Sequence, residues 1–405
     1  MCPSSAILHN TTKLLTSGKE CIRRIVQSRL LALGLRIQHI RASPDNNQDA
    51  SSRKGQIQPI NGNGSYCSLQ ESPSIPILAT PNLSSAPRSI FYFGEKMQDL
   101  AIFAYRVIGQ EAVDKGSIVD FAKAILQSHP EEANQDYNDP PRYRSEVGLM
   151  IANCGQLLWH HASGGKAMTE TSWRAQQRES AVHDSTPVHE KWNRVPGNEV
   201  IDAHVKSVFD FYIEQRRADG NTNEETKGTI NIIALGEGAT AVCNYLNSHW
   251  SLWREYIAAI AIGDGYIWDK PYMSWEPDFR AFFASVSAAH PPFSLSPFPQ
   301  FTSLSFASLS QLIDRLTLIL HNQRARIYLL SKAPLNTPID DDDGSIQDAF
   351  GAPCYSSGEE RWTECIMPRC YEKILEWFKI VERTPGYAQL QKGGRKETER
   401  EGKEG

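Results

Sequence analysis

The chain has 405 residues, 40% of them hydrophobic and 9% aromatic, which is enough for one large domain or two modest domains with a sizeable core. Its net charge is −5, but residues 1–90 are basic and the remainder is acidic, which argues against a broad nucleic-acid-binding face because phosphate contacts need clustered Lys and Arg. No apolar run reaches the roughly 20 residues that a membrane span needs. We therefore expect neither a membrane nor nucleic acid as a direct partner of the globular part.

Residues 1–88 are predicted to form a disordered basic extension followed by a linker. Residues 1–42 are Arg-rich and poor in acids, and Cys21–Ala42 can form a basic amphipathic helix. A disordered extension, a mitochondrial presequence and a nucleic-acid-binding arm are the alternatives for this segment. Residues 43–88 are rich in Ser, Asn, Gln, Pro and Gly, which is typical of a flexible linker.

Between residues 89 and 385, strand-like and helix-like segments alternate. In chain order, they are a strand at Ser89–Phe93, helices at Met97–Ile108 and Ile118–His129, a strand at Gly148–Asn153, a helix capped by Asn198 and ending at Arg217, a strand at Thr229–Leu235, a helix at Ala239–His249, a strand at Tyr256–Ile262, a helix at Leu309–Leu320, a strand at Arg326–Leu330 and a helix at Tyr371–Val381.

The strands in this series are apolar throughout, so both of their faces are expected to be buried. That pattern is typical of a mostly parallel central sheet with helices on both faces, and it predicts a single α/β domain over residues 89–385. Residues 266–307 interrupt the alternation with aromatic residues and prolines, and we predict an insertion over the carboxyl edge of the sheet there. Residues 386–405 are charged and Gly-rich, and we predict a disordered tail.

The segment Ala234-Leu-Gly-Glu-Gly238 lies between a predicted strand and a predicted helix, where hydrolases place the nucleophile elbow Gly-x-Ser-x-Gly. Small residues occupy both flanking positions, but Gly236 occupies the nucleophile position. The expected chain order ends with a histidine after the last strand, yet no histidine follows His321. The elbow residues Gly236, Glu237 and Gly238 are therefore predicted to be a structural turn without catalytic residues.

A phosphate-binding loop is the other functional interpretation of this turn. Gly236-x-Gly238 is only part of the Gly-x-Gly-x-x-Gly fingerprint, the acid expected about 20 residues later is not at a strand end, and no Walker lysine follows. We therefore expect no nucleotide cofactor.

Metal-binding patterns are also incomplete. His160, His161, His183 and His189 lack zinc-site spacing, the eight cysteines contain no Cys-x-x-Cys pair, and the acidic run Asp340–Gly344 fails the spacing of a calcium loop. We expect no metal ion, and we expect reduced cysteines in an intracellular protein.

Two loops after predicted strands are candidate pocket rims. The first contains Asn153, Gly155, Gln156 and Trp159, and in a hydrolase sheet the loop at this place supplies an oxyanion donor. The second is Cys354-Tyr-Ser-Ser-Gly-Glu359. Simple turns are the alternative for both.

Several stretches occur together in an order that resembles a known family. They are Ile151-Ala-Asn-Cys-Gly-Gln-Leu-Leu-Trp-His160, Lys166-Ala-Met-Thr169 with Ser172-Trp173, Ala181-Val-His183, Val195-Pro-Gly-Asn198 with His204-Val205, the Gly-x-Gly turn, and Ser356-Ser-Gly-Glu359 with Thr363-Glu364. The chain resembles, over about residues 89–385, the fungal domain named for the second Argonaute-binding protein, which is also the C-terminal domain of fungal class II histone deacetylases.

The resemblance implies an α/β-hydrolase-like fold that acts as an interaction module without established catalysis. It implies partners among Argonaute-type or deacetylase-complex subunits, a possible homodimer, and a location in the nucleus, the cytoplasm or both. Its motifs single out a set of residues as family positions: Asn153, Gly155, Gln156, Trp159, Trp173, Pro196, Gly197, Asn198, Ser356, Ser357, Gly358 and Glu359. A divergent hydrolase or esterase that uses Ser356, Ser357 or Thr240 as its nucleophile is the alternative.

Overall fold

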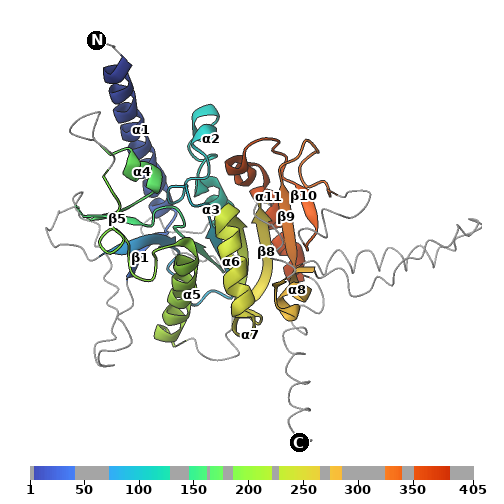
Figure 1. The fold of residues 1–405 in the computed structure, drawn as a ribbon. Coiled ribbons are helices and arrows are strands. Elements are labelled where there is room, and N and C mark those ends of the chain that lie inside the picture. The colour runs from blue at the N-terminus through green and yellow to red at the C-terminus, as the bar shows by residue number, and fades with distance from the viewer. Residues whose placement is uncertain are drawn as a thin grey trace, which may run out of the picture. The chain divides into compact units, whose positions relative to one another are not determined.

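The computed structural model describes residues 4–41, 73–127, 146–161, 165–176, 186–220, 228–264, 274–284, 324–339 and 351–383 (Figure 1). The chain divides into two compact units. The first contains Met1–Gly228 and Ile232–Tyr245, and the second contains Thr229–Asn231 and Leu246–Gly405.

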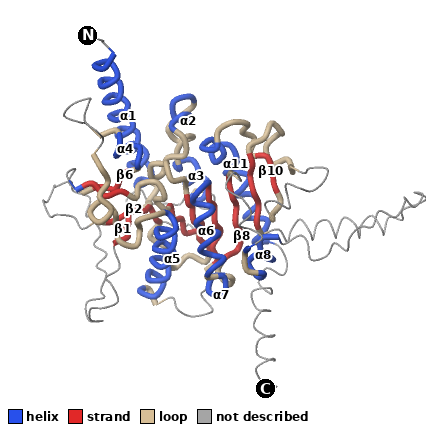
Figure 2. Tube along the Cα trace, viewed as in Figure 1, coloured by secondary structure: helices blue, strands red, loops and turns tan. Residues whose placement is uncertain are grey.

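Among the described residues, the strands of the first unit lie in the order β1-β2-β4-β3-β7, with Ile232–Leu235 as the part of β7 that belongs to it. β1 pairs antiparallel with β2, β2 pairs antiparallel with β4, and β3 runs parallel to β4. A separate antiparallel hairpin is formed by β5 and β6 (Figure 2). The strands are β1 (Arg36–Arg41), β2 (Ser74–Ala79), β3 (Arg88–Phe93), β4 (Val147–Ile151), β5 (Leu158–His160), β6 (Lys166–Met168) and β7 (Thr229–Leu235).

Helices cover both faces of β3 in this unit. Side chains of a strand alternate between its two faces. Phe91 and Phe93 contact the ring of Phe209 on one face, and Tyr92 contacts Phe103 and Phe121 on the other. The helices are α1 (Ser4–Ala32), α2 (Tyr105–Gln110), α3 (Ile118–Leu126), α4 (Glu170–Arg174), α5 (Ile201–Ala218) and α6 (Gly236–Ser248).

The second unit contains three parallel strands in the order β8-β9-β10. They are β8 (Ile257–Gly263), β9 (Ala325–Leu329) and β10 (Cys354–Ser356). The long helix α11 (Ile366–Arg383) packs on β8 and β9 and buries one apolar stripe along its length. Two shorter helices, α7 (Trp250–Trp253) and α8 (Pro277–Ala284), complete the described part of this unit.

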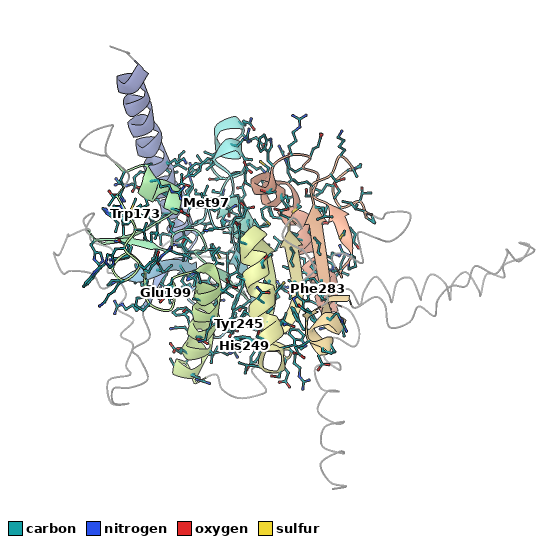
Figure 3. All side chains as sticks on the ribbon, in the orientation of Figure 1. Met97, Trp173, Glu199, Tyr245, His249 and Phe283 are labelled. Carbon is teal, nitrogen blue, oxygen red and sulfur yellow. The ribbon has the colours of Figure 1, made fainter. Side chains whose placement is uncertain are left out.

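The described part of the predicted insertion at 266–307 is residues 274–284. Trp275 and Phe283 there are buried, and their rings lie 5.0 Å apart (Phe283 is labelled in Figure 3). These aromatic residues therefore form part of the core of the second unit. The rest of the insertion, the predicted helix at Leu309–Leu320 and the predicted tail at 386–405 lie outside the described residues.

The predicted α/β class with mostly parallel strands and helices is confirmed, and the apolar runs located the strands within two residues at each end. The helix predicted at Met97–Ile108 is wrong, because only Tyr105–Gln110 is helical and Ala101 has a positive φ of 65°. The cap predicted at Asn198 is also wrong, because α5 begins at Ile201 after Val200.

The domain start predicted at residue 89 is too late. β1 and β2 pair over six residues, from Arg36 with Ala79 to Arg41 with Ser74, and β2 continues the ladder to β4. Val26, Leu30 and Leu35 are buried, so the chain before residue 42 belongs to the core of the first unit. The Ser-rich and Pro-rich composition of the predicted linker concealed the strand at its end, whereas residues 42–72 lie outside the described range.

Basic side chains of α1 bind acidic and aromatic groups of the same unit. Arg23 Nη1 donates to Asp99 Oδ1 over 2.8 Å, and the Asp99 side chain is only 5% exposed. Arg29 pairs with Asp114, and Lys19 Nζ lies 4.8 Å from the centre of the Tyr105 ring. Among the described helices, α1 included, none is long and apolar enough to cross a bilayer.

Replacing Arg23 is expected to destabilise the first unit. Arg23→Gln leaves the buried Asp99 carboxylate without its cation, and breaking a buried ion pair costs about 3 kcal/mol. Arg24→Gln is the matched control, because the Arg24 side chain is 77% exposed and pairs with Glu20 at the surface. Urea unfolding should show a loss of about 2–4 kcal/mol for Arg23→Gln and about 0.5 kcal/mol or less for the control. Equal losses of unfolding free energy for the two variants would show that the ion pair between Arg23 and Asp99 does not stabilise the packing of α1.

Candidate functional site

The strand–turn–helix at the end of β7 is tighter than the sequence predicts. α6 begins at Gly236, directly after the last residue of β7, and not at Ala239. Gly236 has a φ of +48°, in the left-handed region that side-chain-bearing residues rarely adopt. The elbow therefore has the backbone of a strained turn, and a glycine occupies its strained position.

Glu95 lies where a side chain at Gly236 would project. A Cβ atom placed on Gly236 would lie 3.0 Å from Glu95 Cγ and 3.6 Å from its Oε1. Glu95 follows β3 after Gly94, and its backbone N–H donates to Gln98 Oε1 over 3.2 Å. A carboxylate side chain from the segment after β3 thus lies beside the position that a side chain at residue 236 would take.

Gly238 and Gly155 permit backbone contacts that no other residue allows. A Cβ atom on Gly238 would lie 2.3 Å from the carbonyl oxygen of Gly94, and one on Gly155 would lie 1.8 Å from the carbonyl oxygen of Gln98. Both distances are far below van der Waals contact. The segments after β3 and β4 and the first turn of α6 therefore meet through their backbones, which brings together the two predicted candidate segments at Asn153–Gln156 and Gly236–Gly238.

Little space remains where these loops meet. The pocket between the segments 92–102 and 152–155 has a volume of about 10 Å³, which is close to the minimum for one water molecule. Cys154 lines it, and burial raises the pKa of the Cys154 thiol to about 12, so the thiol stays protonated at neutral pH. The described residues provide neither a substrate-sized pocket nor a thiolate nucleophile at this position.

Asn153 and Gln156 hold the loop after β4 in place. Asn153 Oδ1 accepts from the Gln156 backbone N–H over 3.0 Å, and Asn153 Nδ2 donates to the Pro76 carbonyl and to Gln156 Oε1. Gln156 Nε2 donates to Asp99 Oδ1 over 3.0 Å, and Asp99 Oδ2 accepts from the Tyr105 hydroxyl. The predicted oxyanion loop is therefore joined by side-chain hydrogen bonds to the residues that bind α1.

His204 of α5 links this loop to Asn198. Its ring is completely buried, and its Nε2 lies 3.2 Å from the Asn153 backbone N–H, which donates to it. Its Nδ1 lies 2.7 Å from Asn198 Oδ1, so Nδ1 carries the proton of the neutral ring. Burial lowers the pKa of His204 to about 3, so the histidine is neutral and structural at physiological pH.

Trp159 and Trp173 pack in the hairpin region of the first unit. Trp159 is buried, and a Cβ atom on Gly165 would lie 2.8 Å from its ring, so glycine lets the chain just before β6 lie against that ring. Trp173, labelled in Figure 3, is buried, and its Nε1 donates to the Thr186 carbonyl over 2.8 Å. The ring of His160 lies edge-on to Trp173 with 5.2 Å between centroids.

Pro196 and Gly197 are exposed in the turn before α5. Gly197 has a φ of +78°, its N–H donates to Glu199 Oε1, and its carbonyl accepts from the Ser207 hydroxyl. Together with Asn198, they bend the chain into the helix that carries His204. Pro196, Gly197 and Asn198 therefore shape the turn before α5, whereas Val200 is the cap residue of the helix.

Ser356 is the last residue of β10 in the second unit, and Ser357 directly follows it, so the predicted loop at Cys354–Glu359 begins as a strand. Both are completely buried; the Ser356 hydroxyl donates to the Ala333 carbonyl over 2.7 Å, and Ser357 Oγ accepts from the Glu359 N–H. Gly358 has a φ of +70°, and Glu359 Oε1 accepts from the backbone N–H groups of Arg361 and Trp362. Thr240, the third alternative nucleophile, lies within α6 with a buried hydroxyl.

The histidines considered as metal ligands do not cluster. Within the described ranges, no three His, Cys, Asp or Glu side chains gather closely enough to hold a metal ion. His161 Nε2 lies 2.6 Å from the Trp192 carbonyl, and the ring of His189 lies beside that of Trp192. His183 and the acidic run Asp340–Gly344 lie outside the described residues.

Sequence reasoning missed Glu95, Asp99 and the linking role of His204. Asp99 lies in the irregular segment that was predicted to be helical from Met97, and Glu95 lies two residues before it, so no pattern distinguished them from surface acids. His204 stands on the apolar face predicted for its helix, between Ile201 and Val205, which was the one available signal.

The fold and the site define a class: an α/β protein whose strand–helix elbow carries glycine at the nucleophile position and whose surrounding loops are closed by backbone contact. The Arb2 domain model matches residues 68–291, more than half of the chain, and the chain belongs to this family. The predicted resemblance to the Argonaute-binding type of domain is thereby confirmed. The match includes β2 and the elbow and ends before Ser356. No curated protein matches this chain.

Alanine at Gly236 is expected to cost more than alanine at a glycine whose surroundings are empty. Gly220 is the matched control, because it has a φ of +72° and nothing lies within 4 Å of an added Cβ. Gly220→Ala should lose about 1 kcal/mol from the left-handed backbone alone, and Gly236→Ala about 1 kcal/mol more from contact with Glu95. Chemical denaturation measures both, and Glu95→Ala in the Gly236→Ala background should recover the difference. No recovery would show that Glu95 does not fill the nucleophile position.

His204 should make stability sensitive to acid. Its pKa is about 3 when folded against an ordinary value of 6.5, so the stabilisation is complete above pH 6.5 and is lost as pH falls toward 3. Each pH unit in this window costs about 1.4 kcal/mol. The difference in unfolding free energy between the wild type and His204→Gln should therefore shrink by about 2 kcal/mol between pH 6.5 and 5. Parallel pH profiles would contradict the assignment of a neutral buried ring.

Proposed function

We propose that this protein is a non-catalytic interaction module of small-RNA-directed heterochromatin silencing, acting in an Argonaute chaperone-type complex or in the assembly of a deacetylase complex. The observation that carries the proposal is the elbow: Gly236 has the strained backbone of a nucleophile but no side chain, and Glu95 fills the adjacent space. Membership of the Arb2 domain family supports the silencing pathway.

The topology of the first unit supports an α/β-hydrolase-like ancestry. Its order is β1-β2-β4-β3-β7, β2 is antiparallel to both of its neighbours, and the elbow follows the fifth strand of this set. A nucleophile elbow on a strand-to-helix turn is the feature that hydrolases of this kind share. We infer a hydrolase-like scaffold that has kept the bend of the elbow while the nucleophile position changed to glycine.

The alternative of an unconventional hydrolase gains no support from the described residues. A nucleophilic hydroxyl needs a general base within hydrogen-bond reach and access to substrate. Ser356 and Ser357 are buried and bonded to backbone groups, and the Thr240 hydroxyl is buried in α6. The Ser356 and Ser357 hydroxyls therefore bind backbone groups, and the buried Thr240 hydroxyl has no hydrogen-bonded base among the described residues.

The proposed partners are Argonaute-type or deacetylase-complex subunits, with a second copy of the chain as a further possibility. The proposed location is the nucleus, the cytoplasm or both. Incorporation of α1 into the first unit favours this location over the mitochondrial alternative, because removing a presequence that contained α1 would expose the surfaces that Val26 and Leu30 cover. The acidic balance of the globular part favours protein partners over nucleic acid.

Affinity purification of the tagged full-length chain from its native cells, followed by mass spectrometry, tests the proposal. Argonaute or deacetylase subunits are expected, and their recovery should be unchanged in Ser357→Ala, which removes only a buried hydroxyl. Recovery of metabolic enzymes in their place would contradict the silencing role.

A serine-reactive fluorophosphonate probe tests the absence of catalysis in the same preparation. No labelling is expected, because the described serine hydroxyls proposed as nucleophiles have no activating base. Robust labelling that disappears in Ser357→Ala would establish the hydrolase alternative.

A further inference from the structure

An arginine in the second unit lies against aromatic rings and has no acidic partner among the described residues. Arg326 is on β9, and its guanidinium carbon lies 4.5 Å from the centre of the Tyr355 ring on β10 and 4.9 Å from the Trp377 ring on α11. Tyr328 is two residues further along β9, so it projects from the same face of the strand as Arg326. The group is therefore assembled from three elements, β9, β10 and α11 (Figure 1).

Hydrogen-bond donors in this group are buried without acceptors. Among the described residues, Arg326 has no carboxylate within ion-pair distance, and its Nε is buried with no hydrogen-bond partner. The Tyr328 hydroxyl and Trp377 Nε1 are likewise buried without an acceptor for their protons within the described part of the chain, although Arg326 interacts with the Tyr328 oxygen. A buried donor that lacks an acceptor costs about 1–3 kcal/mol, so three such donors in one group require an explanation.

Aromatic contact explains only part of this arrangement. A guanidinium over Tyr and Trp rings is stabilised by attraction to the ring faces. That attraction leaves the buried Nε–H of Arg326 without an acceptor, because the N–H bonds of a guanidinium lie in its plane and point outward from its edge. A planar fork of donors matches the geometry of carboxylate and phosphate oxygens, with which arginine forms paired hydrogen bonds.

We propose that Arg326 and Tyr328 form a binding site for an oxyanion, a carboxylate or a phosphate, with Tyr355 and Trp377 holding the guanidinium in position. The guanidinium supplies the charge and paired N–H donors, and the Tyr328 hydroxyl supplies a further donor. Burial raises the pKa of Tyr328 well above its usual value, so the hydroxyl keeps its proton and donates at neutral pH. The site lies after the residues matched by the family, and it is independent of the elbow.

The source of the oxyanion is either a free small ion or an acidic side chain of a protein partner. Both present the same oxygen atoms to Arg326. A small ion needs only the donor groups of the site, whereas a partner peptide gains affinity from additional neighbouring contacts. A comparison of small ions with an acidic peptide therefore distinguishes the two sources.

Thermal unfolding of the full-length chain in the presence of inorganic phosphate or malonate tests the site, with sodium chloride at equal ionic strength as the reference. Both oxyanions are expected to raise Tm in proportion to occupancy. The increase should disappear in Arg326→Gln and should correspond to about tenfold weaker binding in Arg326→Lys, which keeps the charge but loses the planar fork. Arg361→Gln is the matched control, because the Arg361 side chain is 73% exposed, and it should keep the full increase.

Tyr328→Phe provides a second variant in case Arg326→Gln does not fold. It removes one hydroxyl from a buried ring and should weaken oxyanion binding by about tenfold while the circular dichroism spectrum stays native. Fluorescence polarisation with a labelled hexaglutamate peptide forms the second arm. Tighter binding of the peptide than of malonate assigns the site to an acidic partner, and weaker binding assigns it to a free ion. An oxyanion effect that persists in both Arg326→Gln and Tyr328→Phe, or that the wild type lacks, would overturn the proposal.

Discussion

The first unit depends on close backbone contact between three segments: the chain after β3, the chain after β4 and the first turn of α6. Gly238 lies against the carbonyl of Gly94, and Gly155 lies against the carbonyl of Gln98, at distances that leave no room for a Cβ atom. These contacts fix the direction in which α6 leaves β7 and the path of the chain after β4. Because both contacts involve main-chain atoms, a side-chain rotation elsewhere cannot relieve a substitution at either glycine.

Polar groups buried beneath these loops are satisfied mainly by one another. Asn153 bonds to Gln156, Gln156 bonds to Asp99, and Asp99 accepts from Arg23 of α1. In the other direction, the Asn153 backbone N–H donates to His204 of α5. Networks of this kind stabilise a fold when complete and are costly when one member is lost. The N-terminal helix α1 and α5 are consequently linked through the loop after β4, which contains Asn153 and Gln156.

Those parts of the fold that depend on local patterns could be predicted from the sequence. The apolar run Thr229–Leu235 gave the bounds of β7 correctly because a strand buried on both faces contains no polar interruption. β1 was missed because an edge strand with the sequence Arg-Ile-Gln-His-Ile-Arg is half-exposed and polar. The elbow followed from the spacing of its small residues, whereas Glu95 acquires its role from a contact across 141 positions of the chain that no local pattern encodes.

Glycine at position 236 affects the conformational strain of the turn as well as the side-chain chemistry that is available there. A side-chain-bearing residue held in the left-handed region stores about 1–3 kcal/mol of strain, which enzymes keep because the strain positions a nucleophile. Gly236 adopts the same region at little steric cost, so the turn stores little strain. Glu95 then fills the space beside it, and the three loops close to a pocket of about 10 Å³. A rigid turn without a side chain at position 236 and with little open space beside it fits the proposed role of presenting a fixed surface to a partner.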